Sequence, residues 1–344
     1  MRNKRTFWAV LGTPLVLMII AGCLGHTGCS PRAGPPERIA IGTNFNEMVG
    51  LLFIAEAQGF YRTQGLEVAI REYQTGLAPL KDLEEGRLDL ASCAEFALTG
   101  EVLAGRAGQL RCLAVIAAGE VDFLIARRDR GIKQPGDLRG KIIGVPRKTS
   151  AEFFLAGFLT LNNISLGEVT VADVRPKEMA DALAGGKVDA VLVWAPVTDG
   201  IIKKLGNNAI VWPAQGGQNV YRLLVTRDEM IKKRGPVLER LLRSLAQAGG
   251  FMERQPEAGR AVIAQRLQVN IADLQSGKAS INYESFLDQG LLLAMEDQAR
   301  WLIRNRLTYQ DRVPDFLGCI HAETLLQVDP RAMRLVLPGK EAAK

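Results

Sequence analysis

The residues best placed to do chemistry in this sequence lie in the stretch 140–155, GKIIGVPRKTSAEFFL. The apolar run from Ile142 to Val145 is typical of a strand, and Thr149 and Glu152 then have the spacing of a helix capping box. Backbone N–H groups at a helix start have no intrahelical partner and carry partial positive charge, so they can bind an anionic or carbonyl-bearing ligand. The stretch therefore predicts a strand, a loop and a helix start that could hold such a ligand.

Histidine and cysteine offer little for catalysis or metal binding. Two histidines occur, His26 and His321, and the five cysteines form no CxxC motif and no paired Cys/His spacing. Cys93 and Cys112 lie in apolar surroundings, which predicts buried thiols rather than a disulfide. Neither a GxxxxGKS/T phosphate loop nor a GxSxG motif occurs. We therefore predict no catalytic residues, no metal site and no cofactor.

The length and charge of the chain narrow the function classes further. A chain of 344 residues is long enough for two domains, because a single core stops growing near roughly 250–300 residues. The formal net charge is +6, and three of the positive charges are Arg2, Lys4 and Arg5. The other Lys and Arg residues are scattered among acidic residues and form no basic stripe. This pattern argues against nucleic acid as a partner.

The N-terminal residues have the layout of an export signal. After the basic residues, an apolar run extends from Phe7 to Ala21, which is short for a membrane-spanning helix of about 20 apolar residues. The run ends in Ile20-Ala21-Gly22-Cys23, which resembles a bacterial lipobox, in which the cysteine is lipidated and becomes the first mature residue. We predict a signal peptide at 1–22, a lipid anchor on Cys23 and a Gly- and Pro-rich tether at 23–37.

Such a protein would be exported and anchored to a bacterial membrane, facing the periplasm or the cell exterior. A plain signal peptide without lipidation, or a poor membrane helix, is the alternative interpretation of the same residues.

Strand and helix patterns alternate over the rest of the chain. Apolar runs at 38–42, 66–73, 88–92 and 110–117 are typical of strands, with helical spacing between them. After a strand at 121–126, the alternation restarts with strands at 142–145, 169–174, 188–193 and 209–212, and a further strand follows at 221–226. Short strands that alternate with helices imply a mainly parallel sheet, with ligand loops at the carboxyl ends of its strands.

This organisation predicts an α/β protein of two lobes. Residues 38–120 plus 218–335 would form lobe one, and residues 121–217 would form lobe two, including the crossing strands. Each lobe would be a mainly parallel sheet flanked by helices. From about Asp228 onward the pattern is mostly helical, and we expect this C-terminal tail to pack on lobe one.

Several segments, in this order and spacing, carry a family resemblance. They are Leu52–Tyr61, Gly65–Val68, Gly86–Ala91, Asp137–Val145, Thr149–Phe154 and Gly186–Val191, followed by Trp194-Ala195-Pro196. Together they extend over most of residues 38–330. The chain resembles the solute-binding proteins of ABC importers of the nitrate, sulfonate and taurine type, which are related to thiamine-precursor pyrimidine binders.

The resemblance implies a type II periplasmic-binding-protein-like fold, in which two lobes close on a small ligand by a hinge motion. It also implies a monomer without enzymatic activity. Its partners would be an ABC permease, a separate ATPase subunit and the membrane that holds the lipid anchor.

Candidate ligand-binding residues follow from the loops at the carboxyl ends of the strands. They are Thr43, Asn44, Asn46, Thr75, Gly76, Glu95 and Phe96 in lobe one, and Thr149, Ser150, Glu152 and Trp194 in lobe two. Helix capping is the structural alternative for Thr149, Ser150 and Glu152, because caps use the same side chains. Trp194 could stack on a planar ligand or pack beneath its loop, and Lys148 fits a solvated surface charge.

The carboxylates Glu95 and Glu152 bear on the charge of the ligand. In the family that this chain resembles, the members that bind oxoanions tend to carry uncharged polar groups at such turns. Two carboxylates therefore argue against a simple inorganic anion. We expect a small polar organic solute, namely a sulfonate, a taurine-like zwitterion or a pyrimidine-like heterocycle. A carboxylate would meet the cationic or N–H end of a zwitterion or heterocycle.

Two other functions stay open on the same fold. A pyrimidine-precursor synthase-like enzyme would need histidine or cysteine near the cleft, and only Cys93 stands close to a candidate loop. A ligand sensor for a membrane partner would use the same closure without transport. The export leader argues against intracellular synthesis.

Overall fold

The computed structural model describes residues 35–275 and 280–336 of the chain. The predictions for the signal peptide at 1–22, for Cys23 and for most of the tether at 23–37 lie outside the described residues. The first strand begins at Glu37, one residue earlier than expected. Among the described residues, no helix is long and apolar enough to cross a membrane.

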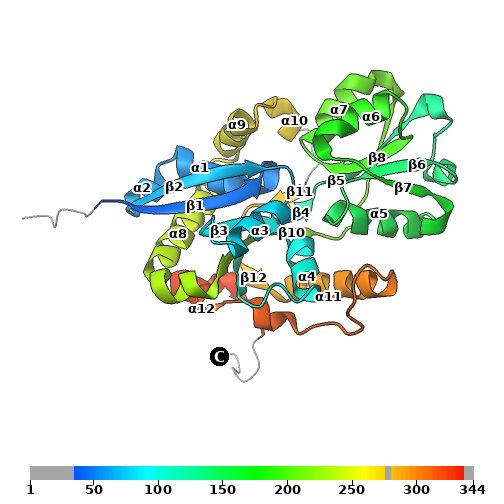
Figure 1. Ribbon diagram of the computed structural model, residues 1–344. Helices are drawn as coiled ribbons and strands as arrows, with labels where there is room; N and C mark the ends of the chain where they lie inside the picture. The colour runs from blue at the N-terminus through cyan, green and yellow to red at the C-terminus, as the bar shows by residue number, and fades with distance from the viewer. Residues whose placement is uncertain (1–34, 276–279, 337–344) are drawn as a thin grey trace, which may run out of the picture. The chain divides into compact units, whose positions relative to one another are not determined.

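Six strands form a first sheet in the spatial order β11-β4-β10-β3-β1-β2 (Figure 1). Their bounds are β1 Glu37–Asn44, β2 Leu66–Tyr73, β3 Leu90–Ala94, β4 Leu110–Glu120, β10 Val220–Arg227 and β11 Ser280–Asn282. Strand β1 pairs in parallel with β2 and β3, whereas β10 lies antiparallel between β3 and β4 and β11 lies antiparallel beside β4. Strands β1 to β4 therefore share one direction, as helical crossovers require.

Five strands form a second sheet in the order β7-β6-β8-β5-β9. Their bounds are β5 Asp122–Arg127, β6 Ile142–Val145, β7 Thr170–Asp173, β8 Ala190–Trp194 and β9 Ala209–Pro213. Strand β6 pairs in parallel with β7 and β8, and β5 lies antiparallel between β8 and β9. The α/β class is confirmed, and both sheets are mixed, with most strands of each sheet running in one direction. Strands β5 and β10, which arrive from the other sheet, run against their neighbours because no helical crossover sets their direction.

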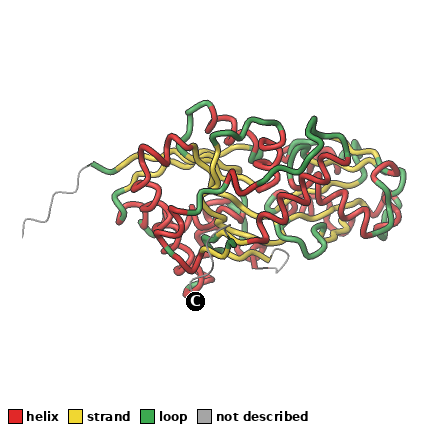
Figure 2. The backbone as a smooth tube through the Cα atoms, turned by 90° about the horizontal axis from the view of Figure 1, so that it is seen from below, coloured by secondary structure: helices red, strands yellow, loops and turns green. Residues whose placement is uncertain are grey.

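Helices, red in Figure 2, flank the strands. They are α1 Gly50–Ala57, α2 Phe60–Thr63, α3 Leu77–Glu84, α4 Glu95–Leu103, α5 Ser150–Leu161, α6 Met179–Ala184, α7 Val197–Leu205, α8 Asp228–Arg254, α9 Pro256–Leu267, α10 Ile271–Gln275, α11 Gln289–Arg304 and α12 Glu323–Val328. The helical tail packs as expected, because α8 contacts α1 and α2 while α11 contacts α4. Two short strands within this tail, β12 Leu287–Asp288 and β13 Met333–Arg334, pair in parallel.

Central strands of both sheets contain long apolar stretches, as expected where helices cover both faces of a sheet. In the first sheet, residues 112–117 of β4 are fully buried, and in the second sheet residues 190–193 of β8 are fully buried. The predicted buried thiols of Cys93 and Cys112 are confirmed, since both are free and inaccessible to solvent.

A buried glutamine joins the two segments by which the chain crosses between the sheets. Gln215 is 3% exposed, and its Oε1 accepts hydrogen bonds from the backbone N–H groups of Val121 and Asp122, at 2.5 and 2.8 Å. Its Nε2 donates to the carbonyl oxygens of Gly119 and Gln218, at 3.1 and 2.7 Å. One side chain therefore ties the outgoing crossing to the returning one.

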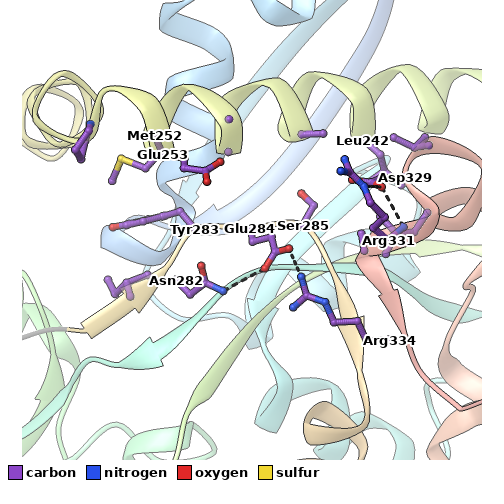
Figure 3. Close-up of a pocket in the computed structure, with 18 of the residues that line it drawn as sticks. Leu242, Met252, Glu253, Asn282, Tyr283, Glu284, Ser285, Asp329, Arg331 and Arg334 are labelled. Carbon is purple, nitrogen blue, oxygen red and sulfur yellow. Dashed lines mark hydrogen bonds and ion pairs between the residues drawn. The ribbon is translucent and has the colours of Figure 1, made fainter.

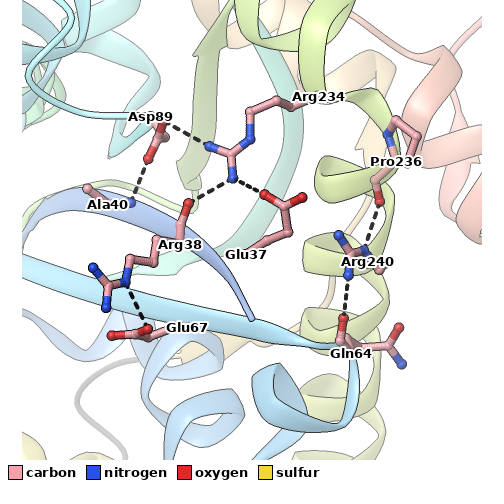
Figure 4. Close-up of polar contacts among 9 residues, drawn as sticks. All are labelled: Glu37, Arg38, Ala40, Gln64, Glu67, Asp89, Arg234, Pro236 and Arg240. Atoms are coloured by element: carbon pink, nitrogen blue, oxygen red, sulfur yellow. Dashed lines mark hydrogen bonds and ion pairs between the residues drawn. The ribbon is translucent and has the colours of Figure 1, made fainter. Parts of the chain in front are cut away.

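An arginine at a kink in α8 fixes the start of β1 (Figure 4). Arg234 has non-helical backbone angles, φ −135° and ψ 31°, two residues before Pro236. Its Nη2 donates to Glu37 at 2.9 Å and to the carbonyl oxygen of Arg38 at 2.8 Å, and its Nη1 lies 3.5 Å from Asp89. This network holds the C-terminal helical tail against the end of the first sheet at which β1 begins.

Candidate functional site

A small cavity lies between the two sheets, at loops that the sequence singled out. Its lining residues are Asn44, Asn46, Met48, Gly76, Leu77, Ala94, Ala97, Val220 and Arg222 from the first-sheet segments, and Val121, Asp122, Lys148, Thr149, Ser150 and Trp194 from segment 121–194. The cavity holds about 30 Å³, far below the roughly 300–1,000 Å³ of typical ligand pockets. A ligand larger than water can therefore enter only when the two faces of the cavity move apart.

Arg222 supplies a buried positive charge to this cavity. It lies in β10, between β3 and β4, and is 4% exposed. Its Nη1 donates a 2.9 Å hydrogen bond to Oδ1 of Asn44, while its Nε has no hydrogen-bond partner. Burial lowers the pKa of Arg222 to about 10, although Cys93, Glu95 and Asp122 act in the opposite direction. The unpaired Nε–H group is a donor that a bound anion could use.

Asp122 supplies a buried negative charge to the same cavity. It begins β5, lies opposite Trp194 of β8 in the strand register, and is 2% exposed. Neither carboxylate oxygen has a hydrogen-bond partner of acceptable geometry. Burial raises the pKa of Asp122 to about 7 with Glu95 acting in the same direction, whereas Arg222 and the nearby Ser150 hydroxyl lower it. Apart from the nearby Ser150 hydroxyl, Asp122 is thus a buried acceptor without a donor.

Three helix starts also line the cavity. Gly76 precedes α3, Ala94 precedes α4 and Thr149 precedes α5. None of these three N-cap residues makes a side-chain capping hydrogen bond. Backbone N–H groups in the first turn of a helix, together with the helix dipole, favour a bound anion. Together with Arg222, these helix starts give the cavity wall several groups that attract negative charge.

The predicted capping box at the start of α5 is wrong. The Thr149 hydroxyl donates backward to the carbonyl oxygen of Pro146 at 2.6 Å and caps no helical N–H group. Glu152 accepts hydrogen bonds from the backbone N–H of Lys148 at 2.8 Å and from Nη1 of Arg147 at 2.9 Å. Lys148 has a left-handed φ of 61°, and the N–H group of Lys148 takes the place of the Thr149 N–H group as donor to Glu152. The helix start is therefore left without a side-chain cap.

Six of the predicted ligand-binding residues line the cavity, namely Asn44, Asn46, Gly76, Thr149, Ser150 and Trp194. Thr43, Thr75, Glu95, Phe96 and Glu152 are not among the lining residues. Asn46 also has a structural role, because its Oδ1 accepts a hydrogen bond from the N–H of Met48 at 3.1 Å. Lys148, which we expected to be only a solvated charge, is exposed and lies at the cavity.

Glu95 is committed to the protein interior. It is 0% exposed, and its Oε2 accepts a hydrogen bond from the N–H of Tyr221 at 2.8 Å, while Oε1 accepts from Nε2 of Gln298 at 2.7 Å. Burial raises its pKa to about 7, against the effect of these hydrogen bonds. Glu95 therefore joins β10 to α11.

Phe96 belongs to an aromatic cluster. Its ring centroid lies 6.2 Å from that of Phe153 in α5 and 6.1 Å from that of Trp301 in α11, and the Phe153 and Trp301 centroids are 5.7 Å apart. The cluster connects a helix that follows a second-sheet strand to two helices on the first-sheet side.

The sequence interpretation missed the two buried charges, Asp122 and Arg222. Each interrupts an otherwise apolar strand, VDFLIA at 121–126 and YRLLVT at 221–226. A charged side chain within a strand expected to be buried is a usable signal, because burial of an unpaired charge is costly unless a partner or ligand compensates. The charged residues are visible in the sequence, but they become a signal only once both strands are recognised as buried.

A second and larger cavity lies on the first-sheet side (Figure 3). It holds about 970 Å³ and is lined by residues from α8, α9 and the segments 281–285 and 325–334, together with Glu47 and Leu274. Several of its charges are already paired, because Glu284 contacts Arg334 and Asp329 contacts Arg331 (Figure 3). None of the predicted ligand-binding residues lines it. The smaller cavity is therefore the candidate site.

The described residues offer little for catalysis or metal binding. They contain no group of three or more His, Cys, Asp or Glu side chains that could hold a metal ion. Burial raises the pKa of the Cys93 and Cys319 thiols to about 12 and that of Cys112 well above its ordinary value. A buried thiol with a raised pKa is a poor nucleophile.

Comparison with solved structures identifies the class of fold. The alkanesulfonate-binding protein SsuA from Xanthomonas axonopodis pv. citri, bound to MOPS, matches with a TM-score of 0.69 at 19% identity, over 84% of this chain and 100% of that one. A Candida albicans protein with the generic periplasmic binding protein fold matches with a TM-score of 0.64 at 12% identity, over 88% and 99%. At such identities the likeness shows the fold alone, and it confirms the expected periplasmic-binding-protein fold.

Sequence comparison identifies the family. The profile of NMT1/THI5-like proteins matches residues 46–259, well over half of the chain, and the chain therefore belongs to the NMT1/THI5-like family. A protein of Brucella abortus (strain 2308), named as a binding protein, is 26% identical over 230 residues, which are 65% of this chain and 69% of the relative. The taurine-binding periplasmic protein of Escherichia coli is 24% identical over 44% of this chain and 46% of its own length.

A further relative is named as an aliphatic sulfonates-binding protein of Bacillus subtilis. It is 27% identical over 188 residues, covering 53% of this chain and 54% of the relative. The relatives that match over these lengths are named as binding proteins, in agreement with a solute-binding role for the family member described here.

Proposed function

We propose that the chain is the extracytoplasmic solute-binding component of an ABC importer and that it captures a small polar organic solute in the cavity between its two sheets. The observation that carries the proposal is the pair of buried, incompletely bonded charges, Asp122 and Arg222, on the walls of one cavity. A buried charge without a partner costs folding free energy. Its presence at a cavity therefore favours a ligand that supplies the missing partner.

Capture would proceed by a shift between two populations of the protein. A ligand that bridges residues of both sheets binds the closed arrangement better than the open one, and it therefore favours closure. The cavity of about 30 Å³ fits an arrangement in which its two faces are closed on each other. The aromatic cluster of Phe96, Phe153 and Trp301 would stabilise closure, since it joins helices associated with different sheets.

The names of similar proteins support a solute of this size and polarity. They describe binding of aliphatic sulfonates, of taurine and, in one solved structure, of MOPS. Each of these compounds carries a sulfonate, and helix starts with a nearby arginine suit such a group.

We propose the following organisation for the whole chain. Residues 38–120 plus 218–335 form one lobe and residues 121–217 the other, with Gln215 at the crossings. Residues 1–22 are a signal peptide, Cys23 carries the lipid anchor and 23–37 form a tether. The exported chain would then deliver its solute to a permease that a separate ATPase drives, while remaining near the membrane.

An enzymatic function has weaker support. The desulfurization enzyme DSZB shares the fold, with a TM-score of 0.60 at 16% identity, which carries no statement about activity. Cys93 is fully buried, and its raised pKa of about 12 keeps the thiol protonated. A ligand sensor would use the same cavity, so transport and sensing differ in the partner rather than in the site.

The test is a binding screen with the chain from residue 24 onward, which lacks the anchor. Sulfonates, taurine, nitrate, pyrimidines and small amines are added in turn, and the midpoint of thermal unfolding is measured. A ligand at one hundred times its Kd stabilises the folded state by about 2.7 kcal/mol, which shifts the midpoint by several degrees. Mass spectrometry of each mixture reports turnover. Absence of saturable binding of any solute, or consumption of a bound one, would contradict the proposal.

A further inference from the structure

Resting on the proposed function, we infer that the ligand is amphoteric, carrying an anionic group at one end and an ammonium or other N–H donor at the other. Asp122 binds the donor end, and Arg222 with the starts of α3, α4 and α5 binds the anionic end. The substrate class is that of short amino-sulfonates and amino-carboxylates.

The donor end is required by the state of Asp122. Its side chain is 98% buried, lines the cavity and has no hydrogen-bond partner of acceptable geometry on either oxygen. Arg222 does not neutralise it by direct contact, because Nη1 of that guanidinium donates to Asn44 and its Nε is unpaired. Two opposite charges therefore line one cavity without bonding to each other, so both are available to a ligand that enters when the faces of the cavity move apart.

The anionic end is required by the rest of the wall. Arg222 has a free Nε–H group, and three helix starts without side-chain caps surround the same space. Each of these features attracts negative charge. A purely cationic solute would satisfy Asp122 but would meet the same-sign charge of Arg222 and the helix starts.

A purely anionic solute is the main competitor, and it makes a different use of Asp122. It would need Asp122 protonated, so that the carboxyl group donates a hydrogen bond to the anion. The charged groups near this carboxyl are Glu95, Arg222 and Lys148, with the Ser150 hydroxyl beside it. Because burial raises the pKa of Asp122 to about 7, the two modes respond to pH in opposite ways. Affinity for an anion falls as pH rises from 5.5 to 8, whereas affinity for an amphoteric ligand rises.

The experiment compares probes that differ only in the ammonium group. Taurine is paired with propane-1-sulfonate, and β-alanine is paired with butanoate. Binding to the chain from residue 24 onward is measured by titration calorimetry at pH 5.5 and pH 8, for the native protein and for Asp122→Asn. We expect the amphoteric member of at least one pair to bind at least tenfold more tightly at pH 8, and Asp122→Asn to remove that advantage.

Two controls keep the result interpretable. Asp129→Asn removes a carboxylate outside the cavity that is bonded to Arg127 at 2.7 Å, and it should leave every affinity unchanged. Thermal unfolding of each variant establishes that the fold is retained before affinities are compared.

The outcomes separate this inference from the proposed function. Equal affinity for both members of a pair, or an ammonium preference that survives in Asp122→Asn, overturns the amphoteric ligand but leaves solute binding intact. Binding of a neutral or purely anionic solute from the wider screen, with none of the amphoteric probes bound, overturns it as well. If no solute of any class binds, the proposed function fails and the inference fails with it.

Discussion

Replacement of Asp122 by asparagine is expected to stabilise the unliganded protein at pH 8 and to leave its stability almost unchanged at pH 4. The pKa of Asp122 rises from 3.8 to about 7 on folding, so the folded state binds the proton more tightly than the unfolded state does. The free energy of unfolding is then highest below pH 3.8 and falls as the pH rises through 7. Each pKa unit corresponds to about 1.4 kcal/mol, which gives a loss of about 4 kcal/mol in full.

The net gain in the variant at pH 8 should be at most this value of about 4 kcal/mol, because the raised pKa of Asp122 already includes the opposing attraction of Arg222. A functional group that destabilises its own fold is common at binding sites, where the ligand later supplies the missing contact. The gain therefore measures how much free energy the charged Asp122 carboxylate costs the folded protein when no ligand contacts it.

Urea unfolding of the native protein and the variant at pH 4, 6 and 8 measures the effect. The pKa values of Glu47 and Glu95 are also raised to about 7, so both proteins lose stability as the pH rises and only their difference reports on Asp122. Asp129→Asn is the matched control and should give no gain at pH 8, because a hydrogen bond from Arg127 lowers the pKa of Asp129. A loss of stability in Asp122→Asn at pH 8 would refute the reasoning, since it would reveal a structural partner of the carboxylate.

Three further substitutions test other parts of the structure. Gln215→Ala leaves two buried N–H groups and two carbonyl oxygens without this side chain as partner, and it should lower the free energy of unfolding by about 2–4 kcal/mol in urea titrations. The control is Gln218→Ala at an exposed position. If Gln215→Ala changed the free energy of unfolding no more than this control, the side chain of Gln215 would not tie the two crossings together. Glu95→Gln should leave the affinity of any solute found in the screen within twofold by calorimetry, because Glu95 does not line the cavity, and a tenfold loss would restore it as a ligand residue. Phe153→Ala removes ring contacts at 5.7 and 6.2 Å and should raise the Kd of that solute at least fivefold, whereas an unchanged Kd would show that the aromatic cluster has no part in closure.

Much of the architecture follows from local sequence patterns. Apolar runs of strand length that alternate with helical spacing predict parallel strands joined by crossovers, and parallel strands bring their carboxyl-end loops to one edge. For this reason Asn44, Asn46, Gly76, Thr149 and Ser150 meet at one cavity although they are up to about a hundred residues apart in the chain.

The roles of the acidic residues could not be derived in this way. Glu95 stands at the end of a strand as a ligand residue would, yet both of its oxygens accept hydrogen bonds from β10 and α11, which follow much later in the sequence. Glu152 has capping-box spacing, but its carboxylate accepts a hydrogen bond from the N–H of Lys148, which has a left-handed conformation, instead of from the N–H of Thr149. Hydrogen-bond partners from distant elements decide such roles, and no local pattern contains them.

The sequence by itself determined the α/β class, the order of the strands along the chain and the loops that form the site, because each depends on periodicity and on the geometry of crossovers. Only the tertiary structure decided which charges face the cavity. Asp122 and Arg222 lie one hundred positions apart and become neighbours of one cavity because β5 and β10 are the strands that change sheets. Their burial without partners depends on how two sheets approach each other, and this approach is a property of the assembled fold rather than of either strand.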